Sequence, residues 1–223
     1  MTKKLFFQAI FKFALGLILI ALLLFLPAGT LRYWNGWLLI AILFVPMFFA
    51  GIVMMLRNPE LLKKRLNAKE DEAEQKTVIV LSGIMFLAAF VTAGLNYRFG
   101  WIVMPRWTAL LAAGVFLAAY LMYAEVLREN AYLSRTIEVQ EHQEVIDTGL
   151  YGIVRHPMYA ATVILFLSMG FVLGSPISFV ILLAYLPIIA KRIRNEEAVL
   201  ARGLEGYQAY REKVKYKVIP FIW

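Results

Sequence analysis

Long apolar runs, separated by short charged or aromatic segments, dominate the chain. Four of these runs, at residues 5–26, 37–56, 77–95 and 107–127, are close to the roughly 20 residues that a helix needs to cross a bilayer. Charged or aromatic side chains bound each run, as they commonly do at the ends of membrane helices. The pattern predicts four transmembrane helices in the first 127 residues.

A fifth apolar stretch is divided by Gly174-Ser175-Pro176, a sequence typical of a turn. Its arms, 159–173 and 177–190, contain 15 and 14 residues, so each covers about 22 Å of a hydrocarbon core that is about 30 Å thick. We therefore predict a tight helical hairpin. Its second arm is expected to continue without a break to Arg202, as a helix of about 39 Å that projects past the membrane surface.

These elements predict an all-α fold: a polytopic transmembrane helical bundle of about six membrane helices, the last two a short hairpin, and a cytoplasmic C-terminal helix. The charged segment 57–76 contains Leu61, Leu62 and Leu66, which favours a short amphipathic helix on the inner surface. We interpret the N-terminal run as the first span, because it is longer than the apolar region of a usual signal peptide.

Composition and charge agree with a protein in a bilayer. Of the 223 residues 61% are hydrophobic and 17% charged, against about 45–50% and about 25% in soluble domains. Because 19 of the 23 lysines and arginines fall on the side of the two termini, the positive-inside rule predicts a multi-pass protein with both ends in the cytoplasm. In a prokaryotic host this membrane would be the cell inner membrane. The net charge of +8 indicates anionic lipids as partners and no nucleic acid.

Two clusters of polar side chains lie at the predicted membrane surface, at the two bases of the hairpin. The first, 147–159, ends in Arg155-His156-Pro157-Met158-Tyr159, and it could be either a ligand site or simply the start of a helix with proline at its first position. In the second, Arg192 and Glu196 share one helical face, either as an ion pair or as part of a site. Equal arms should make 155–159 and 192–197 neighbours. With no cysteine and two histidines, a metal site is not expected.

The clusters also carry a family resemblance. Four patterns carry it: the run Gly-Leu-Tyr-Gly-Ile-Val-Arg-His-Pro-Met-Tyr from Gly149, the Gly-Ser-Pro turn, Arg-x-x-x-Glu-Glu-x-x-Leu from Arg192, and the later Tyr207-x-x-Tyr210. Together they resemble the isoprenylcysteine carboxyl methyltransferase family, to which membrane phospholipid methyltransferases are related. The likeness covers residues 125–223. Length and composition predict a single membrane domain over 1–223. Hydropathy assigns residues 1–122 to N-terminal transmembrane helices, and the resemblance implies a cofactor-binding methyltransferase core over 123–223.

The resemblance also implies a cofactor and residues for it. The cofactor is S-adenosylmethionine, with S-adenosylhomocysteine as its product. The implied catalytic residues are Arg192 and Glu196, and Arg192 is also the implied substrate-binding residue. The implied cofactor contacts are Gln140, Gln143, Glu144, Val145, Ile146, Tyr151, His156, Pro157, Met158, Tyr159 and Glu196.

By this resemblance the reaction is carboxyl O-methylation of a small amphiphilic or prenylated acceptor that arrives from the membrane lipids. A guanidinium such as that of Arg192 can hold a carboxylate through two parallel hydrogen bonds. N-methylation of an aminophospholipid remains an alternative, and it would need Glu196 or Glu197 as a base. An NADPH-dependent membrane reductase is a further alternative. A transporter or scaffold is disfavoured, because the spans carry almost no charge at their centres.

Overall fold

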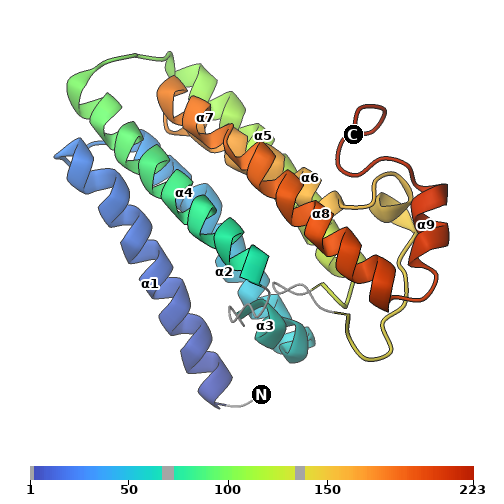
Figure 1. Cartoon of the computed structure of the whole chain (residues 1–223). Helices are drawn as coiled ribbons and strands as arrows, with labels where there is room; N and C mark the ends of the chain where they lie inside the picture. Colours follow the sequence, from blue (N-terminus) through green and yellow to red (C-terminus); the bar gives the residue numbers. More distant parts are fainter. Residues whose placement is uncertain (1–2, 67–72, 134–138) are drawn as a thin grey trace.

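The computed structural model describes residues 3–66, 73–133 and 139–223, and within these ranges all long elements are helices (Figure 1). The first part of the chain forms α1 (Lys3–Ala28), α2 (Trp34–Arg57), α3 (Pro59–Leu66), α4 (Ala73–Phe99) and α5 (Arg106–Glu129). The second part forms the 3-10 turn η1 (Gly149–Gly152), α6 (Pro157–Val172), α7 (Pro176–Leu182), α8 (Tyr185–Gly203) and α9 (Tyr207–Lys213). The predicted all-α fold class is confirmed.

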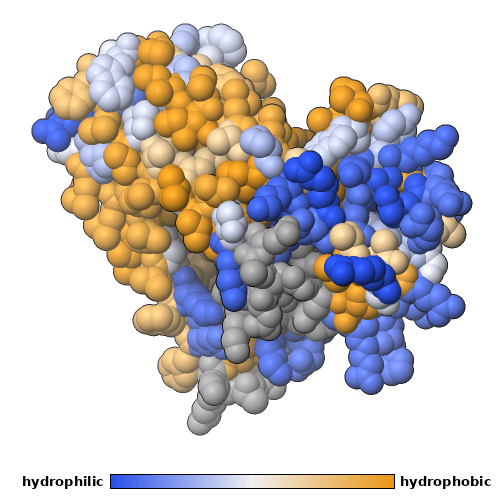
Figure 2. Space-filling model, viewed as in Figure 1, coloured by the Kyte–Doolittle hydropathy of each residue, from blue (hydrophilic) through white to orange (hydrophobic). Residues whose placement is uncertain are grey.

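Five helical segments of the described chain are long and apolar enough to cross a membrane, and α6 is a shorter apolar helix. The five are Leu5–Ala28, Trp34–Arg57, Gln75–Phe99, Arg106–Glu129 and Pro176–Gly203. Large apolar side chains such as Phe7 (68% exposed) and Leu121 (74%) stand on their outer faces, and Figure 2 shows hydrophobic residues covering the bundle. Because so much apolar surface would be unfavourable in water, the chain is an integral membrane protein with several spans.

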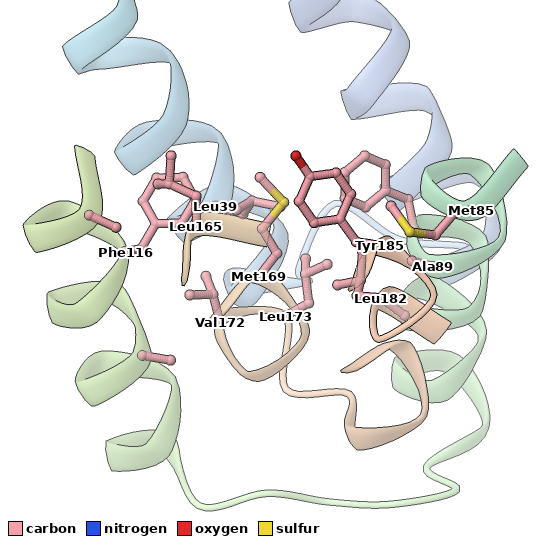
Figure 3. Close-up of a cluster of buried hydrophobic side chains, with 14 of the residues drawn as sticks. Leu39, Met85, Ala89, Phe116, Leu165, Met169, Val172, Leu173, Leu182 and Tyr185 are labelled. Atoms are coloured by element: carbon pink, nitrogen blue, oxygen red, sulfur yellow. The ribbon is translucent and has the colours of Figure 1, made fainter. Parts of the chain in front are cut away.

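The buried core lies where the N-terminal helices meet the hairpin (Figure 3). Leu39 of α2, Met85 of α4 and Phe116 of α5 pack in one cluster with Met169 of α6 and Leu182 of α7. Helix α6 runs along α5, while α7 and α8 pack on α4. The hairpin that carries the two polar clusters is thereby held by three of the N-terminal helices.

The segment after α2 forms the expected short helix, α3, but its leucines are not free to face lipid. Leu61 and Leu62 are 6% and 4% exposed, so they pack against protein. The Lys12 ammonium of α1 donates to the backbone oxygen of Leu66 at 2.6 Å, which fixes the end of α3 beside α1. Residues 67–72 of the predicted segment lie outside the described residues.

The predicted hairpin turn is present between α6 and α7. Gly174 has a φ of +65°, a conformation that glycine adopts without strain, and the Ser175 hydroxyl caps α7 by accepting from the Ser178 backbone N–H at 3.2 Å. The arms approach closely, because a Cβ on Gly170 would lie 2.6 Å from the Phe179 backbone. Sequence therefore predicted this turn for the right chemical reason.

The prediction of an unbroken second arm is wrong, because α7 ends at Leu182 and α8 begins at Tyr185. Pro187 explains the break. Proline has no N–H to donate to the carbonyl of Leu183, four residues earlier, and its ring would collide with that carbonyl. The Leu183 oxygen instead accepts from the Leu186 N–H at 3.0 Å, in a tighter turn. The α-helix of the second arm is thus interrupted at Leu183 and Ala184, before the second polar cluster.

A small lobe, consisting of η1, α9 and the residues up to Trp223, covers the end of α8 (Figure 1). Leu204, Tyr207, Tyr210 and Val214 form a separate buried cluster in it, against Val139, Val145 and Leu200. The chain after α9 pairs with the start of α6, since the backbone N–H groups of Arg155 and His156 donate to the carbonyls of Tyr216 and Lys217 at 2.9 and 2.8 Å. This pairing places the C-terminal segment directly beside the first polar cluster.

Candidate functional site

A cavity lies between the start of α6, the C-terminal half of α8, α9 and the loop that precedes η1. The empty space between these elements is ≈ 830 Å³, a volume that includes solvent at the open side. Its lining residues are Asn130, Tyr132, Leu133, Gln143, Glu144, Val145, Ile146, Tyr151, Arg155, His156, Met158, Tyr159, Arg192, Glu196, Leu200, Leu204, Tyr207 and Tyr210. Both predicted polar clusters therefore contribute to the wall of one cavity, as the expectation of equal arms required.

Tyr159 links the two implied catalytic residues of α8. The Arg192 Nε donates to the Tyr159 hydroxyl at 2.9 Å, and that hydroxyl donates in turn to the Glu196 carboxylate. Tyr159 is 4% exposed and lies in the first turn of α6, where Pro157 starts the helix. The three side chains thus form a continuous chain of hydrogen bonds along the cavity wall, with the guanidinium at one end and the carboxylate at the other.

The His156 imidazole lies between two carboxylates. Its Nδ1 is 4.0 Å from Glu196 Oε1, and its Nε2 is 3.3 Å from Glu197 Oε1. The ring also stacks on Tyr159, with centroids 5.7 Å apart. His156 and Glu196 are therefore close enough to contact the same small molecule, which is the geometry that a shared site requires.

Glu197 is the centre of a buried ion-pair network. Arg155 Nε and Nη2 each lie 2.8 Å from its Oε1, and Lys217 Nζ lies 3.0 Å from its Oε2. Arg155 also donates from Nη1 to the carbonyls of Val214 and Lys215 at 2.6 and 2.9 Å. Because these groups join α6, α8 and the C-terminal segment, the network fixes the relative positions of the elements that form the cavity.

The loop wall of the cavity is held by tyrosines. The Tyr210 hydroxyl donates to the backbone oxygen of Tyr151 at 2.8 Å, and the Tyr151 hydroxyl accepts from Asn130 Nδ2 at 2.9 Å. Burial raises the pKa of both tyrosines well above the usual value, so both hydroxyls stay protonated. Gly149 has a φ of +51°, which favours glycine, and a side chain there would have to displace the Glu129 carboxylate.

Tyr207 differs from its neighbours in having a hydroxyl without a partner. The residue lines the cavity and is 4% exposed, yet its oxygen makes no hydrogen bond within the described part of the chain. Burial raises the pKa of Tyr207, and nearby Glu197 raises it further, so the hydroxyl is a donor at neutral pH. Buried polar groups without partners are rare in native proteins, so this hydroxyl marks a place where a bound molecule would supply an acceptor.

Ten of the twelve residues that the sequence singled out lie on the cavity wall. The two others are Gln140 and Pro157. Gln140 donates to the Tyr132 backbone oxygen and thus supports a wall residue, while Pro157 is buried at the first position of α6. The individual roles of all twelve stay predictions.

Sequence reasoning missed three residues that matter to this geometry. The hairpin placed Arg155 and Glu197 in neighbouring segments, but sequence reasoning assigned Arg155 no role and Glu197 only that of a base in the alternative reaction, and it did not predict their ion pair. Tyr207 belongs to the Tyr-x-x-Tyr pattern of the resemblance, which gave it no role. Only the fold shows that the Tyr210 hydroxyl binds a backbone oxygen of the protein, whereas the Tyr207 hydroxyl binds nothing in the ranges that the structure describes.

The sequence was compared with models of known protein families. Residues 107–202, which run from the start of α5 to the end of α8, match the model of the isoprenylcysteine carboxyl methyltransferase (ICMT) family. This range contains Tyr159, Arg192 and Glu196, and it ends before α9 and Tyr207. No curated protein matches the chain. Residues 107–202 thus resemble the isoprenylcysteine carboxyl methyltransferase family over somewhat less than half of the chain, and this match together with the membrane spans supports a membrane methyltransferase.

Proposed function

We propose that this protein uses S-adenosylmethionine to methylate the carboxylate of a lipid-like acceptor, of the isoprenylcysteine type, at the inner membrane surface. The observation that carries the proposal is the hydrogen-bonded chain from Arg192 through Tyr159 to Glu196, on the wall of a cavity at the end of the membrane helices. The Arg192 guanidinium is a cation that can bind an anionic acceptor, and the Glu196 carboxylate is an anion that can bind a cationic cofactor, both on the same cavity wall.

The cavity has the groups that S-adenosylmethionine requires. Glu144 and Glu196 offer carboxylates to its positive sulfur and amino groups, and Val145, Leu200 and Leu204 offer an apolar surface for its adenine ring. The Tyr207 hydroxyl, which has no partner among the described residues, is a donor for one of the cofactor's oxygen or ring nitrogen atoms. Gln143, Ile146, Tyr151, His156 and Met158 complete the proposed contacts, and Gln140 and Pro157 act through their neighbours.

When bound, the cofactor supplies a methyl group on a cationic sulfur, and an acceptor oxygen takes this group as the carbon–sulfur bond breaks. A carboxylate acceptor is already ionised at neutral pH, so the protein needs to move no proton. In this proposal Arg192 holds the carboxylate in line, and Tyr159 restrains the guanidinium through its Nε. The Glu196 carboxylate, restrained by the same hydroxyl, faces the proposed position of the cofactor.

The surroundings of the two glutamates favour a carboxylate acceptor over an amine. An amine arrives protonated and needs a base to remove its proton. Glu197 is occupied by Arg155, His156 and Lys217, and Glu196 accepts the Tyr159 proton. Neither carboxylate is therefore well placed to act as a base, and an enzyme that transfers a methyl group without a proton is the better match to these contacts.

In the proposed orientation both termini and the α9 lobe face the cytoplasm. Figure 2 shows a hydrophilic region beside the apolar bundle. Helix α9 of the lobe contains Arg211 and Lys213, in agreement with the positive-inside rule. The cofactor would then reach the cavity from the cytoplasm, and the acceptor would arrive from the surrounding lipids. A cysteine-labelling reagent that does not cross membranes tests this, because the chain has no native cysteine: single cysteines at either terminus should be labelled only after the cells are opened.

The experiment that tests the function uses purified protein with S-adenosylmethionine labelled in its methyl group and with lipid extract. Label that is released by mild base identifies methyl esters and supports the proposal. Label that stays on amine headgroups would instead identify N-methylation. Thermal shifts with S-adenosylhomocysteine but not with NADPH should accompany the ester product, and the opposite pattern would point to a reductase. Arg194→Ala, on the exposed side of α8, is the matched control for Arg192→Ala.

A further inference from the structure

Gln75 is a buried glutamine at the inner end of α4, outside the range that matches the family. It is 1% exposed, and its Oε1 accepts from the Arg192 Nη1 at 3.2 Å. Helix α4 packs on α8, so this contact joins the N-terminal helices to the proposed acceptor arginine. Gln75 is therefore a point where the first part of the chain reaches the reaction site.

The chemistry of the contact fixes which way the Gln75 amide faces. A guanidinium has only N–H donors, so the amide must present its oxygen to Arg192 and turn its nitrogen away. That nitrogen, Nε2, is buried and makes no hydrogen bond within the described ranges of the chain. Leaving a buried donor unpaired costs folding free energy, and its two N–H groups are available to an oxygen of a second molecule.

We propose that Gln75 is an acceptor-positioning residue: its oxygen orients Arg192, and its nitrogen donates to the carboxylate that Arg192 holds. This inference rests on the proposed function and deepens it, because it names an oxygen anion as the acceptor group. The oxygen and nitrogen of one amide are only two bonds apart, so Nε2 lies close beside the guanidinium. One carboxylate can accept from both residues, whereas a protonated amine has no lone pair for either.

The position of Gln75 also fits the direction from which the acceptor comes. Gln75 is the first residue of a membrane-spanning segment and does not line the cavity that would hold the cofactor. Arg192 lies between the two, since it lines the cavity and contacts Gln75. The cofactor and the acceptor thus approach the same guanidinium from different sides, as an in-line transfer requires.

Gln75→Glu tests this inference, because it separates structural support from acceptor binding. A carboxylate at position 75 would bind the guanidinium at least as well as the amide does, so a purely structural tie would survive. It would also repel an acceptor carboxylate and remove the donor. We expect the KM for the acceptor to rise at least about tenfold while the affinity for S-adenosylhomocysteine changes less than about twofold.

The matched control is Gln208→Glu. Gln208 accepts from Arg211 Nη1 at 3.3 Å in the same kind of contact, but on the exposed surface of α9. It should leave the KM unchanged. If Gln75→Glu fails to fold, Gln75→Met keeps the length of the side chain and removes both polar groups, and it should raise the KM about fivefold.

An unchanged acceptor KM in the folded Gln75 variant would overturn the inference while leaving the proposed function intact. A lowered KM for an amine acceptor would overturn it as well, because the new carboxylate would then attract the substrate. Failure of the proposed function looks different, since the wild-type protein itself would then form no methyl ester.

Discussion

Arg155 binds Glu197 through two nitrogens, Nε and Nη2, each 2.8 Å from the same carboxylate oxygen, and both side chains are 6% exposed. Arg155 belongs to the residues just before α6, Glu197 to α8, and the same arginine also binds two carbonyls of the C-terminal segment. Buried pairs of this kind contribute little net stability but are costly to break, because the remaining charge loses its partner. The pair therefore fixes the positions of α6, α8 and the C-terminal segment relative to one another.

Glu197→Gln should destabilise the fold by about 3–5 kcal/mol, since the buried Arg155 charge would lose its counter-charge. The segment from Val214 onward should loosen at the same time. Thermal unfolding of the detergent-solubilised protein measures the first effect, and the rate of tryptic cleavage at Lys215 measures the second. Glu205→Gln, on the exposed turn before α9, is the control. Equal melting temperatures and cleavage rates in Glu197→Gln and wild type would show that the pair has no such role.

Tyr207→Phe should lower ligand affinity, whereas Tyr210→Phe should lower the stability of the fold, although the two tyrosines are three residues apart in α9. Tyr207→Phe removes a hydroxyl that has no partner in the described chain, so affinity for S-adenosylhomocysteine should fall about fivefold with stability unchanged or raised. Tyr210→Phe breaks the 2.8 Å bond to the Tyr151 carbonyl and should cost about 1 kcal/mol of stability. Calorimetric titration and thermal unfolding of both variants distinguish the effects, and a Tyr207 variant with wild-type affinity would exclude the contact.

Asp147 connects the loop wall to α9 through an exposed contact with Lys213 at 2.7 Å. The hydrogen bond from Lys213 lowers the pKa of the Asp147 carboxyl, and the lysine charge lowers it further. Its stabilising effect is therefore complete above the unfolded-state pKa of about 3.9 and is lost as the pH falls through the lower folded-state value.

Asp147→Asn should consequently melt below wild type at pH 7 and low salt, and the difference should vanish in acid. High salt should shrink it too, since the contact is exposed. Melting curves of both proteins from pH 7 to pH 3 provide the measurement. A difference that stays constant over this range would mean that the effect comes from packing and not from charge.

Hydropathy and turn chemistry predicted most of the fold, because both are local properties of the chain. The four long spans, the glycine turn at Gly174 and the shortness of α6 all follow from the lengths of apolar runs between breakers. The interruption of the helix at Leu183 was equally local, yet the prediction overlooked Pro187 as its cause. The apolar residues on both sides of that proline hid a breaker that acts four residues upstream.

The site was predicted only as far as the chain brings its residues together through the hairpin. Arg192, Glu196 and His156 could be placed in one region because equal arms return to the same membrane surface. Gln75 and Tyr207 could not, since each reaches the site through packing of distant helices: α4 on α8 for one, α9 on α8 for the other. Whether a polar atom lacks a partner is a property of the folded chain alone.

Arg192→Ala tests the central claim most directly, when methyl transfer and S-adenosylhomocysteine binding are measured on the same purified sample. Our account predicts that ester formation is abolished while the affinity for S-adenosylhomocysteine changes less than about threefold, because Arg192 holds the acceptor and the other wall residues hold the cofactor. Ester formation at the wild-type rate, or a parallel loss of cofactor binding in a variant that still melts like wild type, would contradict it.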